Sequence, residues 1–107
     1  QTQSVDEKFL RKVLQAIEEN IENELYGVEE LANDLNLSRS QLHRKLKALT
    51  DRSPSIFLRA VRLERAKELL EQKAGNASEI AYMVGFSSLS YFSKCFKEQF
   101  GISPRNI

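Results

Sequence analysis

Apolar residues recur every three or four positions along most of the chain, a spacing that predicts helices rather than strands. The first such run follows Ser4 and Glu7, which have the spacing of a helix capping box. This run predicts a helix over Asp6–Leu25 that ends before Gly27, with an acidic outer face. Its inward positions would be Phe9, Leu10, Val13, Leu14, Ile17, Ile21 and Leu25.

The next segment predicts two helices separated by a turn at residues 36–37. A short helix covers residues 28–35, and Ser38 with Gln41 then has capping-box spacing at the start of the second. The inward positions of that second helix share one face: Leu42, Leu46 and Leu49. A rotation of about 100° per residue places polar and cationic side chains on or beside the opposite face, namely Arg39, Ser40, His43, Arg44 and Lys47.

A long helix is predicted to begin at Pro54, because serine followed by proline is a strong helix start. It would run to about Lys73, a length of roughly 30 Å at 1.5 Å per residue. Asn76 then caps a fifth helix, with Glu79 at the capping-box position. A glycine turn at residues 85–86 precedes the last helix, whose cap would be Ser87 or Ser88 and whose buried aromatics would be Tyr91, Phe92, Phe96 and Phe100.

The chain contains an internal repeat. Glu30-Leu31-Ala32 corresponds to Glu79-Ile80-Ala81 at an offset of 49, and Leu42 to Phe92 at an offset of 50, so one inserted residue explains the slip. Ser53-Pro54 corresponds to Ser103-Pro104 at the same later offset. The repeat therefore predicts a duplicated helix-turn-helix whose copies are joined by the long helix.

Composition and charge narrow the class of protein. With 107 residues and 41% hydrophobic content, the chain is about one domain. Residues 1–37 carry a net charge of −6 and residues 38–107 a net charge of +7, as expected of a DNA-facing portion joined to an acidic, solvent-facing one. Cys95 is the sole cysteine, which excludes an internal disulfide, and no apolar run is long enough to span a bilayer. No secretory signal precedes the first charges, so we expect a cytoplasmic protein.

These motifs resemble the DNA-binding domain of the AraC/XylS family of bacterial transcription regulators. The resemblance covers about residues 28–104 and is carried in the second copy by Glu79-Ile80-Ala81, Val84-Gly85-Phe86, Ser90-Tyr91-Phe92-Ser93, Phe96-Lys97, Phe100-Gly101 and Ser103-Pro104. Arg62, Ala66 and Leu69-Leu70 match the linker pattern. Asp51 departs from the glycine usual in the family, although aspartate tolerates the left-handed conformation better than most residues.

The resemblance implies an all-α fold of about seven helices, with two helix-turn-helix subdomains joined by a long linker helix. We expect four segments: a flanking helix at 1–27, a first helix-turn-helix at 28–53, the linker at 54–75 and a second helix-turn-helix at 76–107. Base contacts would come from the outer face of each recognition helix, and the helix geometry selects much the same set: Arg39, Ser40, His43, Arg44 and Lys47, then Leu89, Ser90, Ser93, Lys94 and Lys97.

The same resemblance implies double-stranded DNA and RNA polymerase as partners, with no cofactor, metal or membrane contact by this domain. We expect the chain to be a fragment that lacks an effector or receiver domain, and its lead-in helix resembles that of hybrid two-component sensor-regulators. No catalytic motif is present, so an enzyme is not expected. The alternative is a helical protein-interaction module that uses the linker or the acidic first helix without specific DNA readout.

Overall fold

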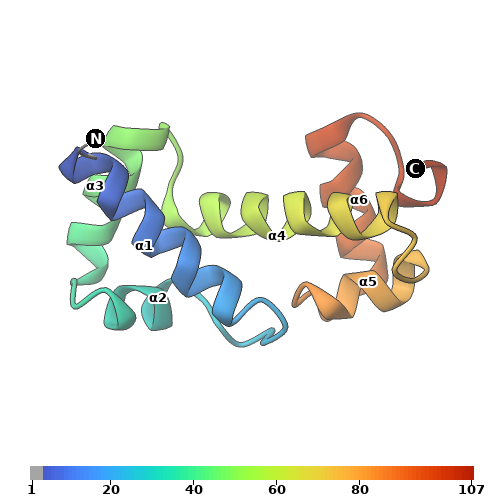
Figure 1. Ribbon diagram of the computed structural model, residues 1–107, viewed down its shortest axis with the longest axis horizontal. Helices are drawn as coiled ribbons and strands as arrows, with labels where there is room; N and C mark the ends of the chain where they lie inside the picture. Colours follow the sequence, from blue (N-terminus) through green and yellow to red (C-terminus); the bar gives the residue numbers. More distant parts are fainter. Residues whose placement is uncertain (1–3) are drawn as a thin grey trace. The chain divides into compact units, whose positions relative to one another are not determined.

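The structure, a computed structural model, describes residues 4–107, and all secondary-structure elements in that part of the chain are helices (Figure 1). Residues 1–3, which the predicted first segment includes, lie outside the described residues. The all-α prediction is confirmed, with six α-helices and one short 3₁₀ helix where about seven helices were expected. The elements are α1 (Val5–Glu19), α2 (Val28–Asp34), α3 (Arg39–Thr50), α4 (Pro54–Glu71), α5 (Ala77–Met83), α6 (Leu89–Phe100) and η1 (Pro104–Asn106).

The chain divides into two compact units. The first unit comprises the residues up to Asn20 together with Tyr26–Leu58, and the second comprises Ile21–Leu25 together with Arg59–Ile107. Each unit holds one helix-turn-helix, α2–α3 or α5–α6, and α4 contributes residues to both. Figure 1 shows α4 as one uninterrupted helix.

The first unit buries the apolar faces of α1, α2 and α3. The predicted capping box of α3 is present, since the Ser38 hydroxyl accepts from the Gln41 amide and the Gln41 side chain accepts from the Ser38 amide. Asn36 in the turn and Asp51 at the end of α3 adopt left-handed backbone angles, φ 58° and 61°. Asp51 replaces the glycine that is usual at this position in the resembled family. It adopts the left-handed backbone conformation that glycine favours. The core residues are Val13, Ile17, Tyr26, Leu31, Ala32, Leu42, Leu46 and Leu58.

The second unit is built around aromatic rings that pack in edge-on and tilted pairs. Phe92 lies edge-on to Phe86 with ring centroids 5.2 Å apart, and Phe96 follows at 5.7 Å from Phe92 and 4.6 Å from Phe100. Such pairs contribute about 0.5–1.5 kcal/mol each beyond the area they bury. The surrounding buried residues are Leu63, Ala66, Ile80, Ala81, Val84 and Cys95. The aromatic face predicted for α6 is therefore a core for all but one of its members, Tyr91.

The predicted first helix is too long. α1 ends at Glu19, where the Asn20 side chain donates to the Ala16 carbonyl at 2.8 Å, and Ile21–Leu25 leaves the helix to join the second unit. Leu25, predicted to face inward, is 79% exposed. Leu14, also predicted inward, is 41% exposed.

Arg62 explains where the Ile21–Leu25 segment goes. Its guanidinium is buried and donates to the carbonyls of Ile21 at 2.5 Å, Val84 at 2.7 Å and Asn23 at 3.0 Å. Burial lowers the pKa of Arg62 from its usual value, but the ordinary pKa of arginine is so high that the group stays charged. These bonds link the segment after α1 to the turn between α5 and α6, which periodicity in sequence cannot reveal.

A buried tyrosine in the first unit predicts a pH effect on stability. The Tyr26 hydroxyl donates to the Asp34 carboxylate at 2.7 Å. Burial is the largest cause that raises the pKa of Tyr26, and the Asp34 carboxylate raises it further. In the unfolded chain this tyrosine ionises near pH 10, which is below its pKa in the folded protein. The stabilisation by Tyr26 is therefore fully present below about pH 10 and is lost as the pH rises above that value. Tyr26→Phe should cost about 1–2 kcal/mol at neutral pH and reduce the alkaline loss of stability. Urea unfolding across this pH range measures both.

The matched control is Tyr82→Phe, which alters a 54% exposed tyrosine on α5. That variant should keep both the neutral stability and the alkaline slope of the unmodified chain. An unchanged alkaline slope in Tyr26→Phe would contradict the assignment.

Candidate nucleic-acid interface

The outer face of α3 presents every residue predicted for the first copy. Leu42 and Leu46 point into the core, and the five predicted side chains are all exposed. Apolar and cationic side chains lie on opposite faces of α3 because burying a cation without a partner costs free energy, whereas an exposed cation remains hydrated. The exposed residues are Arg39, Ser40, His43, Arg44 and Lys47.

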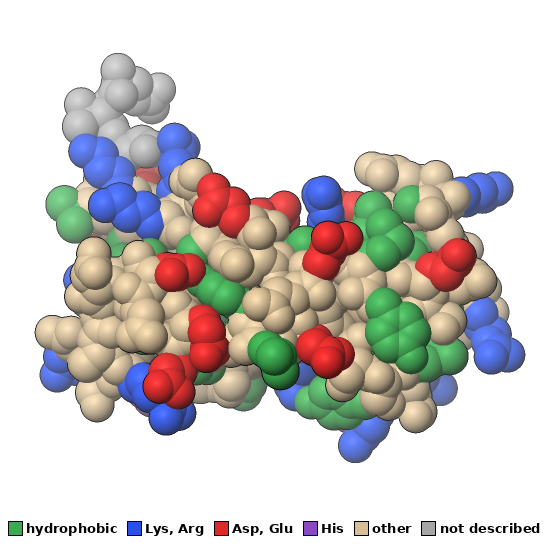
Figure 2. Space-filling model, turned by 90° about the horizontal axis from the view of Figure 1, so that it is seen from below, with side chains coloured by type: hydrophobic (Ala, Val, Ile, Leu, Met, Phe, Trp, Pro, Cys, Tyr) green, Lys and Arg blue, Asp and Glu red, His purple; other side chains and the backbone are tan. Residues whose placement is uncertain are grey.

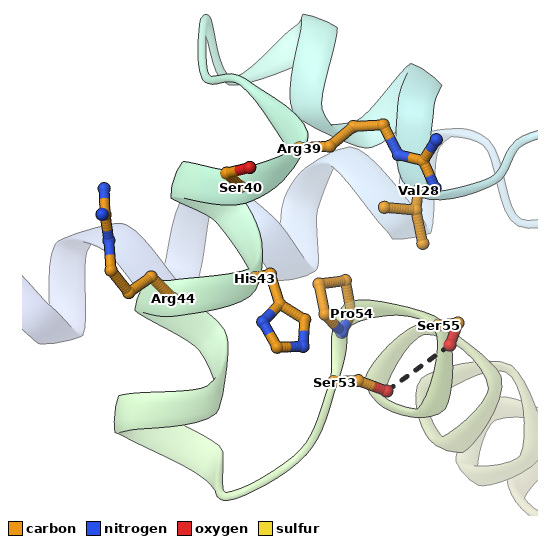
Figure 3. A pocket seen from close by; sticks show the side chains of 8 residues that line it. All are labelled: Val28, Arg39, Ser40, His43, Arg44, Ser53, Pro54 and Ser55. Atoms are coloured by element: carbon orange, nitrogen blue, oxygen red, sulfur yellow. Dashed lines mark hydrogen bonds between the residues drawn. The ribbon is translucent and has the colours of Figure 1, made fainter.

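Four of these residues line a concavity at the start of α3. Its walls also include Val28 at the start of α2 and Ser53, Pro54 and Ser55 at the start of α4. In Figure 3 the His43 ring points toward Pro54, while Arg39 and Arg44 extend from α3 in opposite directions. The concavity is therefore polar on the α3 side and bounded by the serine pair Ser53–Ser55, whose hydroxyls are 3.4 Å apart.

The two lysines of α3 differ in their contacts. Lys47 approaches Asp51, with its Nζ 3.7 Å from the carboxylate and 3.2 Å from the backbone carbonyl, in an exposed ion pair. Such pairs contribute little, about 0–1 kcal/mol, so Lys47 is free to exchange this contact for a phosphate. Lys45 instead lies over the Phe9 ring of α1 at 5.1 Å, which removes it from the outer face.

The outer face of α6 is less cationic. Ser88, one of the two predicted caps, accepts from the Tyr91 amide at 3.2 Å and starts the helix. The predicted residues Ser90, Lys94 and Lys97 are exposed, Leu89 is 39% exposed and Ser93 is half-buried. The structure thus places the ten predicted residues on the surfaces of α3 and α6, and contact with DNA stays a prediction for each.

Tyr91 is the residue of α6 that the sequence analysis placed wrongly. It was predicted to be core, yet it is 49% exposed, and its hydroxyl accepts a hydrogen bond from Arg59 of α4 at 3.1 Å. This bond raises the pKa of Arg59. Helical rotation of about 100° per residue carries Tyr91 away from Phe92 to the edge of the outer face, a signal that the run of aromatics concealed.

Among residues 4–107 no group of three or more histidine, cysteine or acidic side chains is arranged to hold a metal ion. Within the same residues, no helix is both long and apolar enough to cross a membrane.

The comparisons with known proteins bear directly on these two helix-turn-helix units. A family model described as a helix-turn-helix domain matches residues 31–107. A solved transcriptional regulator of the AraC-type DNA-binding domain-containing proteins, from Chromobacterium violaceum, is 34% identical with a TM-score of 0.82. The alignment covers 91% of this chain and 86% of that one. The chain belongs to the AraC-type helix-turn-helix family.

Members of this AraC-type family are DNA-binding transcription regulators. The DNA-binding domain of AdpA, a global transcriptional factor solved in complex with a target DNA, is 30% identical with a TM-score of 0.79, over 89% of this chain and 85% of that one. The regulator GbdR of Pseudomonas aeruginosa is 39% identical over 97 residues, 91% of this chain. Fold and family are thus those of DNA-binding regulators rather than of enzymes.

A fourth relative points to a two-component setting for AraC-type domains of this kind. Histidine kinase P4 of Formosa agariphila is 43% identical over 101 residues, which is 94% of this chain. The chain spans only 7% of the length of that kinase and 26% of GbdR. The names of these two relatives describe whole proteins, and this chain matches only a part of each.

Proposed function

We propose that this AraC-type domain binds a specific double-stranded DNA sequence and regulates transcription by inserting α3 and α6 into adjacent major grooves. The observation that supports this most is that each helix pairs a buried apolar face with an exposed polar face. A helix of this kind can dock on its own domain while it presents donors to base edges.

In the first copy, Arg44 would read a base and Lys47 would bind phosphate. Arginine can donate two hydrogen bonds to O6 and N7 of guanine, and the exposed Arg44 side chain extends from α3 in the direction opposite to Arg39 (Figure 3). Lys47 lies a turn deeper along α3, where phosphate contacts are more common than base contacts. Arg39, Ser40 and His43 would flank these contacts.

In the second copy, the readout would depend more on shape and less on charge. Ser90, Ser93 and Lys94 would face the groove, and Lys97 would bind phosphate. Leu89 would contact a thymine methyl group or pack against its own domain. The second copy resembles the family motif more closely than the first. It nevertheless offers fewer hydrogen-bond donors to base edges.

The linker α4 supports simultaneous binding by both copies. It has 18 residues, about 27 Å at 1.5 Å per residue. Successive major-groove faces on one side of a duplex are about 34 Å apart, so a stiff helix of this length suits two neighbouring grooves. The division into a flanking helix (1–27), two helix-turn-helix segments (28–53 and 76–107) and a linker (54–75) is part of this proposal.

The full-length protein would add a sensing domain and a contact with RNA polymerase. The chain spans only 7% of the relative named as a histidine kinase and 26% of the regulator GbdR, which supports a longer protein with an effector or receiver domain. In either case, this AraC-type chain would be the output domain.

The experiment is a selection from random 30-base-pair duplexes, followed by insertion of five base pairs between the two protected tracts. We expect a site with two tracts about 10 base pairs apart, and the insertion should weaken binding at least about tenfold because half a turn moves one groove to the far side. Five base pairs added outside the site serve as control and should change nothing. If no sequence is enriched, specific DNA binding fails, and if the insertion is harmless, the two-groove arrangement fails.

A protein-interaction module is the second candidate, and one observation favours it. Acidic and hydrophobic side chains both lie on the face shown in Figure 2, and α1 itself exposes Leu14 one turn before Glu18. The two functions separate on salt: DNA affinity falls steeply as salt rises because phosphate contacts release counterions. Both functions are compatible in one transcription regulator.

A further inference from the structure

The Arg59–Tyr91 pair lies outside every role assigned so far. Arg59 belongs to α4 and Tyr91 to α6, and the guanidinium Nη1 donates to the phenol oxygen at 3.1 Å. Tyr91 is nearly half exposed although the next residue, Phe92, is completely buried. A tyrosine that served only as core would have turned its ring inward, so its position at the surface needs an explanation.

Packing fixes the pair in place. The Tyr91 ring lies 6.0 Å from the Phe86 ring, at an angle of 45°, and Phe86 is itself buried against Phe92. Because the ring is held on one side and the hydroxyl on the other, the phenol oxygen loses little further entropy on binding a ligand. The pair is therefore a preorganised surface group rather than a mobile side chain.

The unused hydrogen-bonding capacity of the pair fits an anion. Tyr91 accepts from Arg59 with its oxygen, which leaves its own O–H free to donate. Arginine has five N–H donors and spends one on this bond. Two neighbouring side chains thus offer donors and one positive charge, the combination that binds a phosphate oxygen.

The position of the pair favours the DNA backbone as the source of that phosphate. Tyr91 follows Ser90, which is on the outer face, and precedes Lys94 by three residues, so these side chains share one side of α6. If α6 enters a groove with Ser90 and Lys94 toward the bases, Tyr91 and Arg59 lie at the groove edge. Glu98, whose charge helps to raise the pKa of Arg59, lies two turns beyond Tyr91 along α6.

We propose that Arg59 and Tyr91 together bind one phosphate of the DNA backbone at the edge of the groove that α6 enters. This rests on the proposed function, and it adds a residue of the linker helix to the DNA contacts. Tyr91 donates its O–H to a non-bridging phosphate oxygen, while Arg59 orients the phenol and supplies the charge. The pair compensates for the small number of cations on α6.

The test compares Tyr91→Phe and Arg59→Met with two matched controls on the full chain, using the duplex enriched by selection. Tyr91→Phe keeps the ring on Phe86 and should weaken binding about three- to tenfold. Arg59→Met should weaken it further and reduce the slope of log affinity against log salt by about one. The controls are Tyr82→Phe on α5 and Arg65→Met on α4, whose guanidinium is 3.6 Å from Glu68. Both controls should bind as the unmodified chain does.

Four further results decide the matter. Arg59→Lys should restore the salt slope but not the full affinity, and the double variant should lose less than the sum of the two single losses because both groups serve one phosphate. Variants that melt at lower temperature yet bind DNA normally would overturn the proposal and make the pair a tie between α4 and α6. If the unmodified chain binds no duplex at all, the proposed function itself fails, which is a distinguishable outcome.

Discussion

Replacing Gly85 by alanine should lower the free energy of unfolding of the second unit by about 3–5 kcal/mol. Gly85 adopts φ +86°, a left-handed angle that costs a residue with a Cβ about 1–2 kcal/mol. An added Cβ would also overlap the Arg62 guanidinium and come within 2.6 Å of the Ile21 carbonyl. Arg62 would then have to abandon some of its three carbonyl partners, at about 1–3 kcal/mol for each group left unpaired.

Gly101 supplies the matched control for this substitution. It too is left-handed, at φ +75°, but an added Cβ would meet nothing within 4 Å. Gly101→Ala should therefore cost only the conformational part, about 1–2 kcal/mol. Thermal unfolding followed by circular dichroism separates the two, since each kcal/mol shifts the midpoint by about 4–8 °C in a domain of this size.

A double variant tests the cause of the difference. With Arg62→Met in place, the guanidinium no longer occupies the space beside residue 85, so Gly85→Ala should cost less than it does in the unmodified chain. Equal costs for Gly85→Ala and Gly101→Ala, or no coupling to Arg62, would show that the backbone angle alone makes glycine necessary.

The parts of the fold that could be predicted from the sequence are those set by neighbours along the chain. The capping boxes of Ser38 with Gln41 and of Asn76 with Glu79 are local hydrogen bonds, and both are present. The start of α4 at Pro54 follows from the same local chemistry, and its end at Glu71 falls two residues before the predicted one. Local signals of this kind are encoded within four residues, so spacing alone reveals them.

The parts that the sequence did not reveal depend on partners far along the chain. Ile21 continues the apolar period of α1, but its carbonyl bonds to Arg62, 41 residues later. Tyr91 stands in an aromatic run, but its hydroxyl bonds to Arg59, 32 residues earlier. Periodicity placed Ile21 in the first helix, which ends at Glu19, and Tyr91 in the core, although Tyr91 is 49% exposed. It records the type of each side chain and not the distant groups that these residues contact.

The exposed face of α3 could be predicted better than its surroundings, for a physical reason. Once Leu42 and Leu46 face the core, the helical rotation leaves Arg44 no choice but the opposite side. The loss of Lys45 to the Phe9 ring was not foreseeable, since it depends on how α1 packs. The cationic surface of α3 is thus smaller than its composition suggests, and the proposed base readout depends more on Arg44.

Arg44→Ala should therefore weaken specific DNA binding about 5- to 150-fold, which corresponds to the roughly 1–3 kcal/mol of a bidentate contact with guanine. The effect should be concentrated at one base pair of the enriched site, where the variant no longer prefers guanine. Thermal stability should be unchanged because Arg44 is exposed and no contact of the core depends on it. Fluorescence anisotropy with the enriched duplex, and a repeated selection with the variant, measure the affinity and the lost preference.

Arg44→Lys distinguishes readout from simple charge. Lysine keeps the positive charge, so affinity for unrelated duplexes and the salt slope should stay close to those of the unmodified chain. It cannot present the planar pair of donors, so the preference for guanine at that position should still weaken. Arg52→Ala, which removes an exposed arginine in the turn after α3, is the converse control: it should lower affinity for all duplexes slightly and alter no preference. If Arg44→Ala enriches the same sequence with equal affinity, α3 does not read its site through Arg44, and the concavity beside Arg39 and His43 becomes the next place to test.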